Sequence, residues 1–192
     1  MSMHHNLTIT DKILAKILIP IIPIWMTPNI VSWFRFASVP FVGYFLWIGD
    51  YSIALPLFFV SAFSDALDGS LARTRNLVSN FGKLFDPLAD KLLVSVAAII
   101  LIPRYLDWGI MLAIISIEII LIVSAYAQKL VYKKIVQAEN SGKIKMVLQS
   151  LGIGAILIHA IWGVVAFLAV AQYLFYAAIF FALISLVVYR AI

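Results

Sequence analysis

The sequence predicts an all-α integral membrane protein, with six transmembrane helices preceded by an N-terminal interfacial amphipathic helix. Three observations predict this class. Hydrophobic residues make up 64% of the 192 residues, and the mean hydropathy is +1.06. Charged residues make up 12%, against about a quarter in soluble domains. The apolar residues form six runs, each of a length suited to a bilayer, and most Lys and Arg residues fall between the runs.

Residues 1–28 are expected to form a juxtamembrane amphipathic segment. Asp11 is a suitable N-cap for a short helix. The helix would carry apolar residues on one side and two cations on the other: Ile13, Leu14, Ile17 and Leu18 against Lys12 and Lys16. This pattern is typical of a helix that lies in the interface. Three prolines and the lack of a small-residue cleavage site disfavour the alternative, a signal peptide.

Residues 29–192 are expected to form one six-helix membrane domain. The spans are expected at about residues 30–48, 52–73, 82–103, 108–130, 146–162 and 166–188, with a polar segment at 129–145. Arg35 lies near enough to the end of the first span to reach the interface by snorkelling. Pro87 is expected in the first turn of the third span, where its missing N–H is tolerated. Gly152 and Gly154 are expected at a close helix contact, within the chain or in a homodimer.

The basic residues are distributed unequally between the two sides of the predicted bundle. One side collects Lys12, Lys16, Arg73, Arg75, Lys83, Lys129, Lys133, Lys134, Lys143, Lys145 and Arg190. The positive-inside rule predicts that both termini and these connections are cytoplasmic, in a bacterial-type cytoplasmic membrane. The net charge of +5 is therefore interpreted as a topology signal, and no nucleic-acid partner is expected.

Four carboxylates stand together in this apolar chain. Asp65 and Asp68 are three residues apart and Asp86 and Asp90 are four apart, so each pair lies on one face of a helix. A single Asp near the middle of a membrane helix costs about 2.5–3.5 kcal/mol. A short connection makes the two helices antiparallel neighbours, so the pairs can face each other. Because no Cys is present and the donors are hard oxygens, one or two divalent cations, Mg²⁺ or Mn²⁺, are expected.

The residues around the carboxylates indicate phosphoryl transfer. Gly69, Ala72 and Gly82 are small and allow close approach, and Arg73 is placed to meet a phosphate. In such chemistry the metal ions neutralise a diphosphate, and one carboxylate takes the proton of the attacking hydroxyl. The alternative from another class is a cation transporter or channel that uses the same carboxylates.

The spacing of these residues resembles a known motif. Asp65-x2-Asp68-Gly69-x2-Ala72-Arg73-x8-Gly82-x3-Asp86-x3-Asp90 is similar at every fixed position to the signature of the CDP-alcohol phosphotransferase family. The resemblance implies a six-helix core and a two-metal site made by the four aspartates, with Asp90 as the general base. It implies nucleotide binding by Asn29, Asp65, Gly69, Ala72, Arg73 and Gly82. The implied reaction is attack of an alcohol on CDP-diacylglycerol, with release of CMP.

Within the family, the chain resembles the phosphatidylglycerophosphate synthase branch, whose acceptor is glycerol 3-phosphate. The resembling segments are Thr27-Pro28-Asn29-Ile30 with Arg35, Phe81-Gly82-Lys83 with Asp86-Pro87-Leu88-Ala89-Asp90-Lys91, and Gly142-Lys143-x-Lys145 with Gln149. That branch usually has Arg before the Glu of the fourth span, whereas Ile117 precedes Glu118 here. Other acceptors therefore stay open: phosphatidylglycerol, as in CMP-forming cardiolipin synthesis, or an inositol phosphate.

Acceptor binding is assigned to a basic and acidic set: Arg75, Lys83, Lys91, Glu118, Lys143 and Lys145. Each has a simpler explanation as well. Glu118 either binds substrate or pairs with a lysine or hydroxyl inside the bundle. Lys143 and Lys145 either contact an anionic acceptor or anchor the chain at lipid headgroups.

Overall fold

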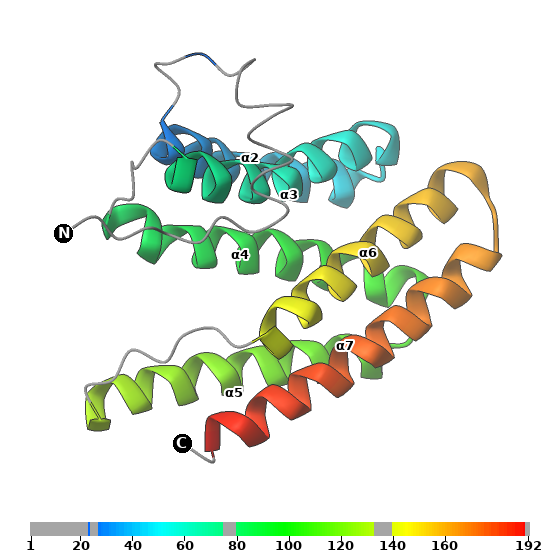
Figure 1. Ribbon diagram of the computed structural model, residues 1–192. Helices are drawn as coiled ribbons and strands as arrows, with labels where there is room; N and C mark the ends of the chain where they lie inside the picture. The colour runs from blue at the N-terminus through cyan, green and yellow to red at the C-terminus, as the bar shows by residue number, and fades with distance from the viewer. Residues whose placement is uncertain (1–22, 24–26, 75–79, 133–139, 191–192) are drawn as a thin grey trace. The chain divides into compact units, whose positions relative to one another are not determined.

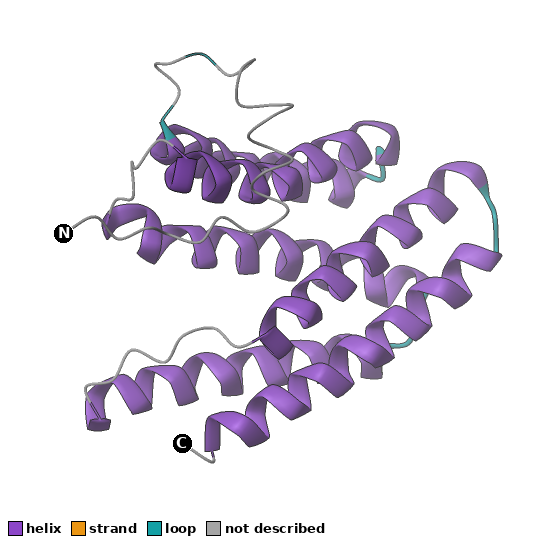
Figure 2. Ribbon diagram, viewed as in Figure 1, coloured by secondary structure: helices purple, strands orange, loops and turns teal. Residues whose placement is uncertain are grey.

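The computed structural model describes residue 23 and residues 27–74, 80–132 and 140–190 (Figure 1). Within these ranges, only the backbone is described for residues 28, 65–70, 72–74, 80–87, 125–132, 140 and 187–190. The described helices are α2 Pro28–Ile48, α3 Tyr51–Thr74, α4 Asn80–Tyr105, α5 Trp108–Tyr132, α6 Asn140–Trp162 and α7 Ala166–Arg190. Figure 2 shows short loops after α2, α4 and α6, and the described part of the chain contains no strand. The predicted all-α class is confirmed, whereas the predicted interfacial helix lies almost wholly outside the described residues.

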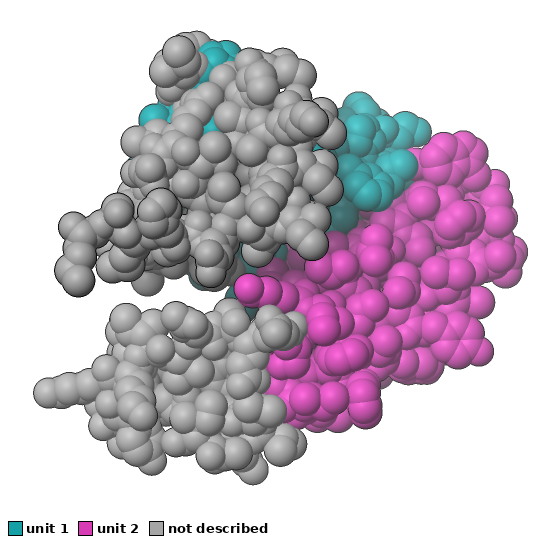
Figure 3. Space-filling model, viewed as in Figure 1, with its two compact units in different colours: residues 1–93 teal, residues 94–192 magenta. Residues whose placement is uncertain are grey.

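The chain divides into two compact units, Met1–Leu93 and Val94–Ile192, which Figure 3 colours separately. Unit 1 contains α2, α3 and the first half of α4. Unit 2 contains the rest of α4 together with α5, α6 and α7. The predicted acidic motif falls entirely within unit 1.

In unit 1, α2 and α3 form a hairpin that packs along its length. Gly49 ends α2 with a φ of 82°, a left-handed conformation that glycine adopts without strain. The N–H of Gly49 donates to the carbonyl of Leu46 at 3.3 Å, and the N–H of Asp50 donates to Phe45 at 3.0 Å. These two bonds make a Schellman motif, which satisfies carbonyls at the helix end. Val42 and Leu46 of α2 and Ala54 and Phe58 of α3 are buried.

In unit 2, α7 packs against both α6 and α5. The turn between α6 and α7 is made by Gly163, with a φ of 69° and an N–H that donates to the His159 carbonyl at 2.7 Å. Gly152 of α6 packs against the ring of the fully buried Phe175 of α7. The expected close helix contact at Gly152 is therefore confirmed, and it occurs within the chain.

Three described segments are long and apolar enough to cross a membrane: Asn29–Ile48, Ser141–Trp162 and Ala166–Leu186. Shorter apolar stretches, Tyr51–Ser64 and Trp108–Ser124, lie inside α3 and α5. Large apolar side chains also cover the outside: Trp47 is 70% exposed and Tyr173 is 74% exposed. Exposed apolar area on this scale is typical of a surface that meets lipid rather than water.

Two predicted helix boundaries are wrong. The fifth helix begins at Asn140 and not near Met146, so the end of the predicted polar segment is helical. Pro87 stands well past the first turn of α4, which begins at Asn80. Both errors have the same cause: hydropathy marks the apolar part of a helix, while backbone hydrogen bonding extends the helix beyond the hydrocarbon.

The contact between α6 and α7 makes a prediction about packing. A Cβ added at Gly152 would lie 2.9 Å from Cζ of Phe175, and that ring is fully buried and has little room to move. We expect Gly152→Ala to lower the free energy of unfolding by about 1–3 kcal/mol, as overpacking does. Thermal unfolding of the purified protein in detergent measures this change.

Gly142→Ala is the matched control, because it is the same substitution in the same helix. A Cβ at Gly142 meets nothing within 4 Å, so this variant gains helix propensity without a clash. The packing account is contradicted if Gly152→Ala unfolds at or above the temperature of Gly142→Ala.

Candidate active site

The predicted site occupies the end of α3 and the start of α4. Asp65 and Asp68 lie on α3, and Asp86 and Asp90 lie on α4. Each pair lies within a single helix, as its spacing predicted. Among the side chains that the structure describes, no three His, Cys, Asp or Glu residues come together as a metal site. Of the four aspartates, only the side chain of Asp90 belongs to that described set.

Asp90 is held by an arginine from α2. Nη1 of Arg35 donates to Oδ1 of Asp90 at 2.8 Å, and Nε of the same guanidinium donates to Oγ of Ser64 on α3 at 3.1 Å. Arg35 has no exposed surface, while the Asp90 side chain keeps 21% of its surface exposed. One buried cation thus joins α2, α3 and α4 at the level of the acidic motif.

Serine hydroxyls complete this polar centre. Oγ of Ser64 donates to the Ser61 carbonyl at 2.7 Å, and Oγ of Ser38 donates to the Arg35 carbonyl at 2.7 Å. The hydroxyls of Ser38 and Ser61 also lie 2.7 Å apart. Since a hydroxyl has one hydrogen, Ser64 must accept from Arg35, and Ser61 must donate to Ser38. All three serines are buried, and these bonds engage each of them.

The expectation that Arg35 snorkels to the interface is wrong. Its guanidinium is fully buried and turns towards Asp90 and Ser64 instead. A charge in a low-dielectric environment is stabilised when it is paired and its donors are satisfied, and both conditions are met here. The sequence contained a signal for this arrangement: Ser32, Arg35 and Ser38 recur every three residues and form a polar stripe on an apolar helix.

A second buried ion pair lies in unit 2. Nζ of Lys145 on α6 donates to Oε1 of Glu118 on α5, and both side chains are at least nine-tenths buried. Oε2 of Glu118 is buried and has no hydrogen-bond partner among the described residues. The sequence left two interpretations of Glu118, and the structure supports the one in which Glu118 pairs with a lysine. Lys145 is correspondingly a buried helix residue, which corrects its placement in a headgroup-anchoring connection.

The other predicted site residues are placed as follows. Asn29 is the second residue of α2 and is part-buried, Lys91 is part-buried on α4, and Lys143 is exposed near the start of α6. The backbone positions of Gly69, Ala72 and Arg73 are on α3, and those of Gly82 and Lys83 are on α4. Arg75 lies outside the described residues.

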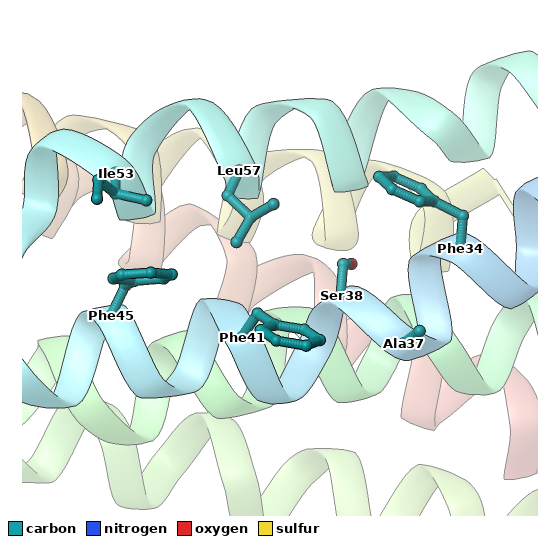
Figure 4. A pocket seen from close by; sticks show the side chains of 7 residues that line it. All are labelled: Phe34, Ala37, Ser38, Phe41, Phe45, Ile53 and Leu57. Atoms are coloured by element: carbon teal, nitrogen blue, oxygen red, sulfur yellow. The ribbon is translucent and has the colours of Figure 1, made fainter.

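An apolar groove of about 420 Å³ lies between α2 and α3. Figure 4 shows the rings of Phe34, Phe41 and Phe45 from α2, with Ile53 and Leu57 from α3, around this space. Its lining is almost entirely carbon. The groove is thus suited to hydrocarbon and not to a polar ligand.

Comparison with known proteins identifies the class. The profile of the CDP-alcohol phosphatidyltransferase family matches residues 25–186, which is most of the chain. The protein belongs to this family of enzymes, as the acidic motif predicted. The match covers all six described helices except the last residues of α7.

Three individual proteins of known name are similar to this chain. The chain is 33% identical over 173 residues to the CDP-diacylglycerol–glycerol-3-phosphate 3-phosphatidyltransferase of Bacillus subtilis, which covers 82% of this chain and 90% of that protein. It is 41% identical over 100 residues to the protein of the same name in Mycoplasma genitalium, covering 50% of this chain and 41% of the relative. It is also 40% identical over 73 residues to the CMP-forming cardiolipin synthase of Rattus norvegicus, covering 38% of this chain and 24% of that protein.

The ion pair in unit 2 predicts a strong coupling between its members. Lys145→Met leaves the Glu118 carboxylate buried without its cation, and loss of one partner of a buried pair costs about 3–5 kcal/mol. We expect the double variant Glu118→Leu/Lys145→Met to recover most of that loss, because neither charge remains. The free energies of unfolding of Glu118→Leu, Lys145→Met and the double variant, measured in detergent, complete a double-mutant cycle. Additive losses would show that the two side chains do not interact.

Proposed function

We propose that the protein transfers the phosphatidyl group of CDP-diacylglycerol to glycerol 3-phosphate and releases CMP. The observation that carries the proposal is the complete acidic motif, whose residues lie on α3 and α4, in a chain that belongs to the CDP-alcohol phosphatidyltransferase family. The names of the Bacillus and Mycoplasma relatives support the acceptor. The match to the Bacillus protein extends over most of both chains, which favours this acceptor over that of the cardiolipin synthases.

In the proposed reaction, a hydroxyl oxygen of the acceptor attacks the phosphorus that carries diacylglycerol. The bond from that phosphorus to the oxygen of CMP breaks, and CMP leaves with the bonding electrons. Asp90 takes the proton of the attacking hydroxyl, as a general base does. Its part-exposed side chain on α4 is accessible for this role.

The nucleotide is proposed to bind on the small-residue part of the motif. Gly69, Ala72 and Gly82 allow its close approach to the backbone, Arg73 pairs with a phosphate, and Asn29 contributes a polar group at the start of α2. Asn29 is described as part-buried, which suits a binding residue.

Asp65, Asp68, Asp86 and Asp90 are proposed to hold two divalent cations. The donor set fits Mg²⁺ or Mn²⁺, because it consists of carboxylate oxygens alone. When bound, these ions neutralise the diphosphate and its departing phosphate.

The acceptor pocket stays a prediction for Arg75, Lys83, Lys91, Glu118, Lys143 and Lys145. The structure favours a distinction within this set. The charge of Lys145 is already balanced by Glu118, whereas Lys143 is exposed. We therefore expect exposed cations, and not Lys145, to meet an acceptor phosphate.

We also propose that all six helices α2–α7 cross the membrane, with both termini and the acidic motif on the cytoplasmic side. The three long apolar segments and the exposed apolar side chains support membrane insertion. The excess of Lys and Arg near the motif supports the orientation. A homodimer is a further expectation that sedimentation in detergent tests.

Removal of the base predicts loss of chemistry in a protein that is destabilised but still folds. We expect Asp90→Asn to reduce CMP release by about 10²–10⁴-fold, the usual contribution of a general base. Asp90→Asn also removes the countercharge of the buried Arg35, so we expect its unfolding temperature to be lower than that of the wild type. Asn keeps an oxygen to which Arg35 can donate, so the purified variant should still unfold cooperatively. Radiolabelled CMP release and thermal unfolding measure the two effects.

Asp107→Asn is the matched control for charge loss. Asp107 caps α5 by accepting from the N–H of Gly109 at 2.6 Å, and Asn is an equally good cap. This variant should retain full activity. Normal turnover in Asp90→Asn would remove the proposed base.

Chelation tests the metal dependence. Excess EDTA should stop CMP release, and added Mg²⁺ or Mn²⁺ should restore it, because four clustered carboxylates without cations repel both one another and the diphosphate. Turnover that continues unchanged in excess EDTA would exclude the proposed cations.

One assay tests the function as a whole. Purified protein is given CDP-diacylglycerol with glycerol 3-phosphate, phosphatidylglycerol or an inositol phosphate, and CMP is measured. We expect release with glycerol 3-phosphate. Release with another acceptor alone would correct the substrate, and no release together with cation flux in sealed vesicles would favour the transporter alternative.

A further inference from the structure

Arg35 connects α3 and α4 next to the acidic motif. Its guanidinium is bonded to Ser64 on α3 and to Asp90 on α4, at 3.1 Å and 2.8 Å. On a helix, residues four apart share a face. Asp68 follows Ser64 by four residues on α3 and Asp86 precedes Asp90 by four on α4, so each of these two sequence positions is about one helical turn from a residue that Arg35 contacts.

The guanidinium is itself held in place. The hydroxyl hydrogen of Ser64 is used on the Ser61 carbonyl, which turns the Ser64 lone pairs towards Nε of Arg35. The guanidinium is planar, so fixing Nε fixes the direction of Nη1. Complete burial of Arg35 restricts other rotamers. The position of Oδ1 of Asp90 is therefore set by α2 and α3, and not by α4 alone.

We propose that Arg35 is a positioning residue, which together with Ser64 orients the Asp90 carboxylate for binding a divalent cation. This inference rests on the proposed function, because it takes Asp90 as a metal ligand. It adds a residue outside the acidic motif to the machinery of the site. Groups that orient metal ligands typically change metal affinity or activity 10–100-fold when they are altered.

The competing explanation is that Arg35 only fastens three helices together. The chain offers a pair of variants that separates the two roles. Ser64 and Ser61 are both buried serines of α3, one turn apart, and each makes side-chain hydrogen bonds to α2. Ser64→Ala removes the partner of Nε of Arg35. Ser61→Ala removes the bond to Ser38 and leaves the guanidinium contacts in place.

The experiment measures Mn²⁺ binding and turnover in the purified full-length protein. Free Mn²⁺ is followed by its electron paramagnetic resonance signal, which binding removes, so the first readout needs no activity. We expect Arg35→Lys, which keeps the charge but loses the planar fork, to raise the Mn²⁺ concentration for half-binding about tenfold. We expect Ser64→Ala to raise it about threefold to tenfold. Ser61→Ala should bind Mn²⁺ as the wild type does.

Turnover should follow the same order, with kcat lowered in Arg35→Lys and Ser64→Ala and the KM for CDP-diacylglycerol nearly unchanged. The temperature of thermal unfolding should be lowered by similar amounts in Ser64→Ala and Ser61→Ala, because each variant loses buried hydrogen bonds. If Arg35→Lys fails to fold, the serine pair still decides the question.

The proposal is overturned if Ser64→Ala and Ser61→Ala have the same Mn²⁺ affinity and the same kcat. In that case Arg35 acts only in stability. A failure of the proposed function looks different: the wild type itself then releases no CMP from CDP-diacylglycerol, whatever the variants do.

Discussion

The fully buried charge of Arg35 is the constraint on which unit 1 depends. An unpaired guanidinium in a membrane domain would be strongly unfavourable, so α2, α3 and α4 must together supply its partners. Asp90 supplies the countercharge and Ser64 supplies a neutral acceptor. The same contacts bring the α4 part of the acidic motif next to the α2–α3 hairpin. The packing of unit 1 and the position of the Asp90 carboxylate therefore both involve this one side chain.

In both units a buried charged side chain is paired with an opposite charge. In unit 1 the polar centre consists of Arg35, Asp90 and three serines, and in unit 2 it is the pair of Glu118 and Lys145. The remaining described surface of the helices is largely apolar. Since apolar side chains can face either lipid or another helix, the buried polar contacts distinguish the correct packing from the alternatives.

The sequence predicted the helices, the acidic pairs and the family, because these depend on local periodicity and spacing. It did not predict which side chains meet across helices. Arg35 and Asp90 are 55 residues apart, and nothing local indicates that they pair. The polar stripe of Ser32, Arg35 and Ser38 indicated an inward face, but not its partner. Similarly, the structure buries Lys145 and Gln149 four residues apart on α6, and the sequence alone did not indicate that Lys145 pairs with Glu118.

The central claim is that the carboxylates of α3 and α4 hold divalent cations while Arg35 keeps Asp90 in position. An experimental structure with Mn²⁺ and CDP, with anomalous scattering recorded at the manganese edge, tests this most directly. The account predicts anomalous peaks beside Asp65, Asp68, Asp86 and Asp90, with the Asp90 carboxylate still bonded to Arg35. Peaks located elsewhere, or an Asp90 turned away from both the metal and Arg35, would contradict it.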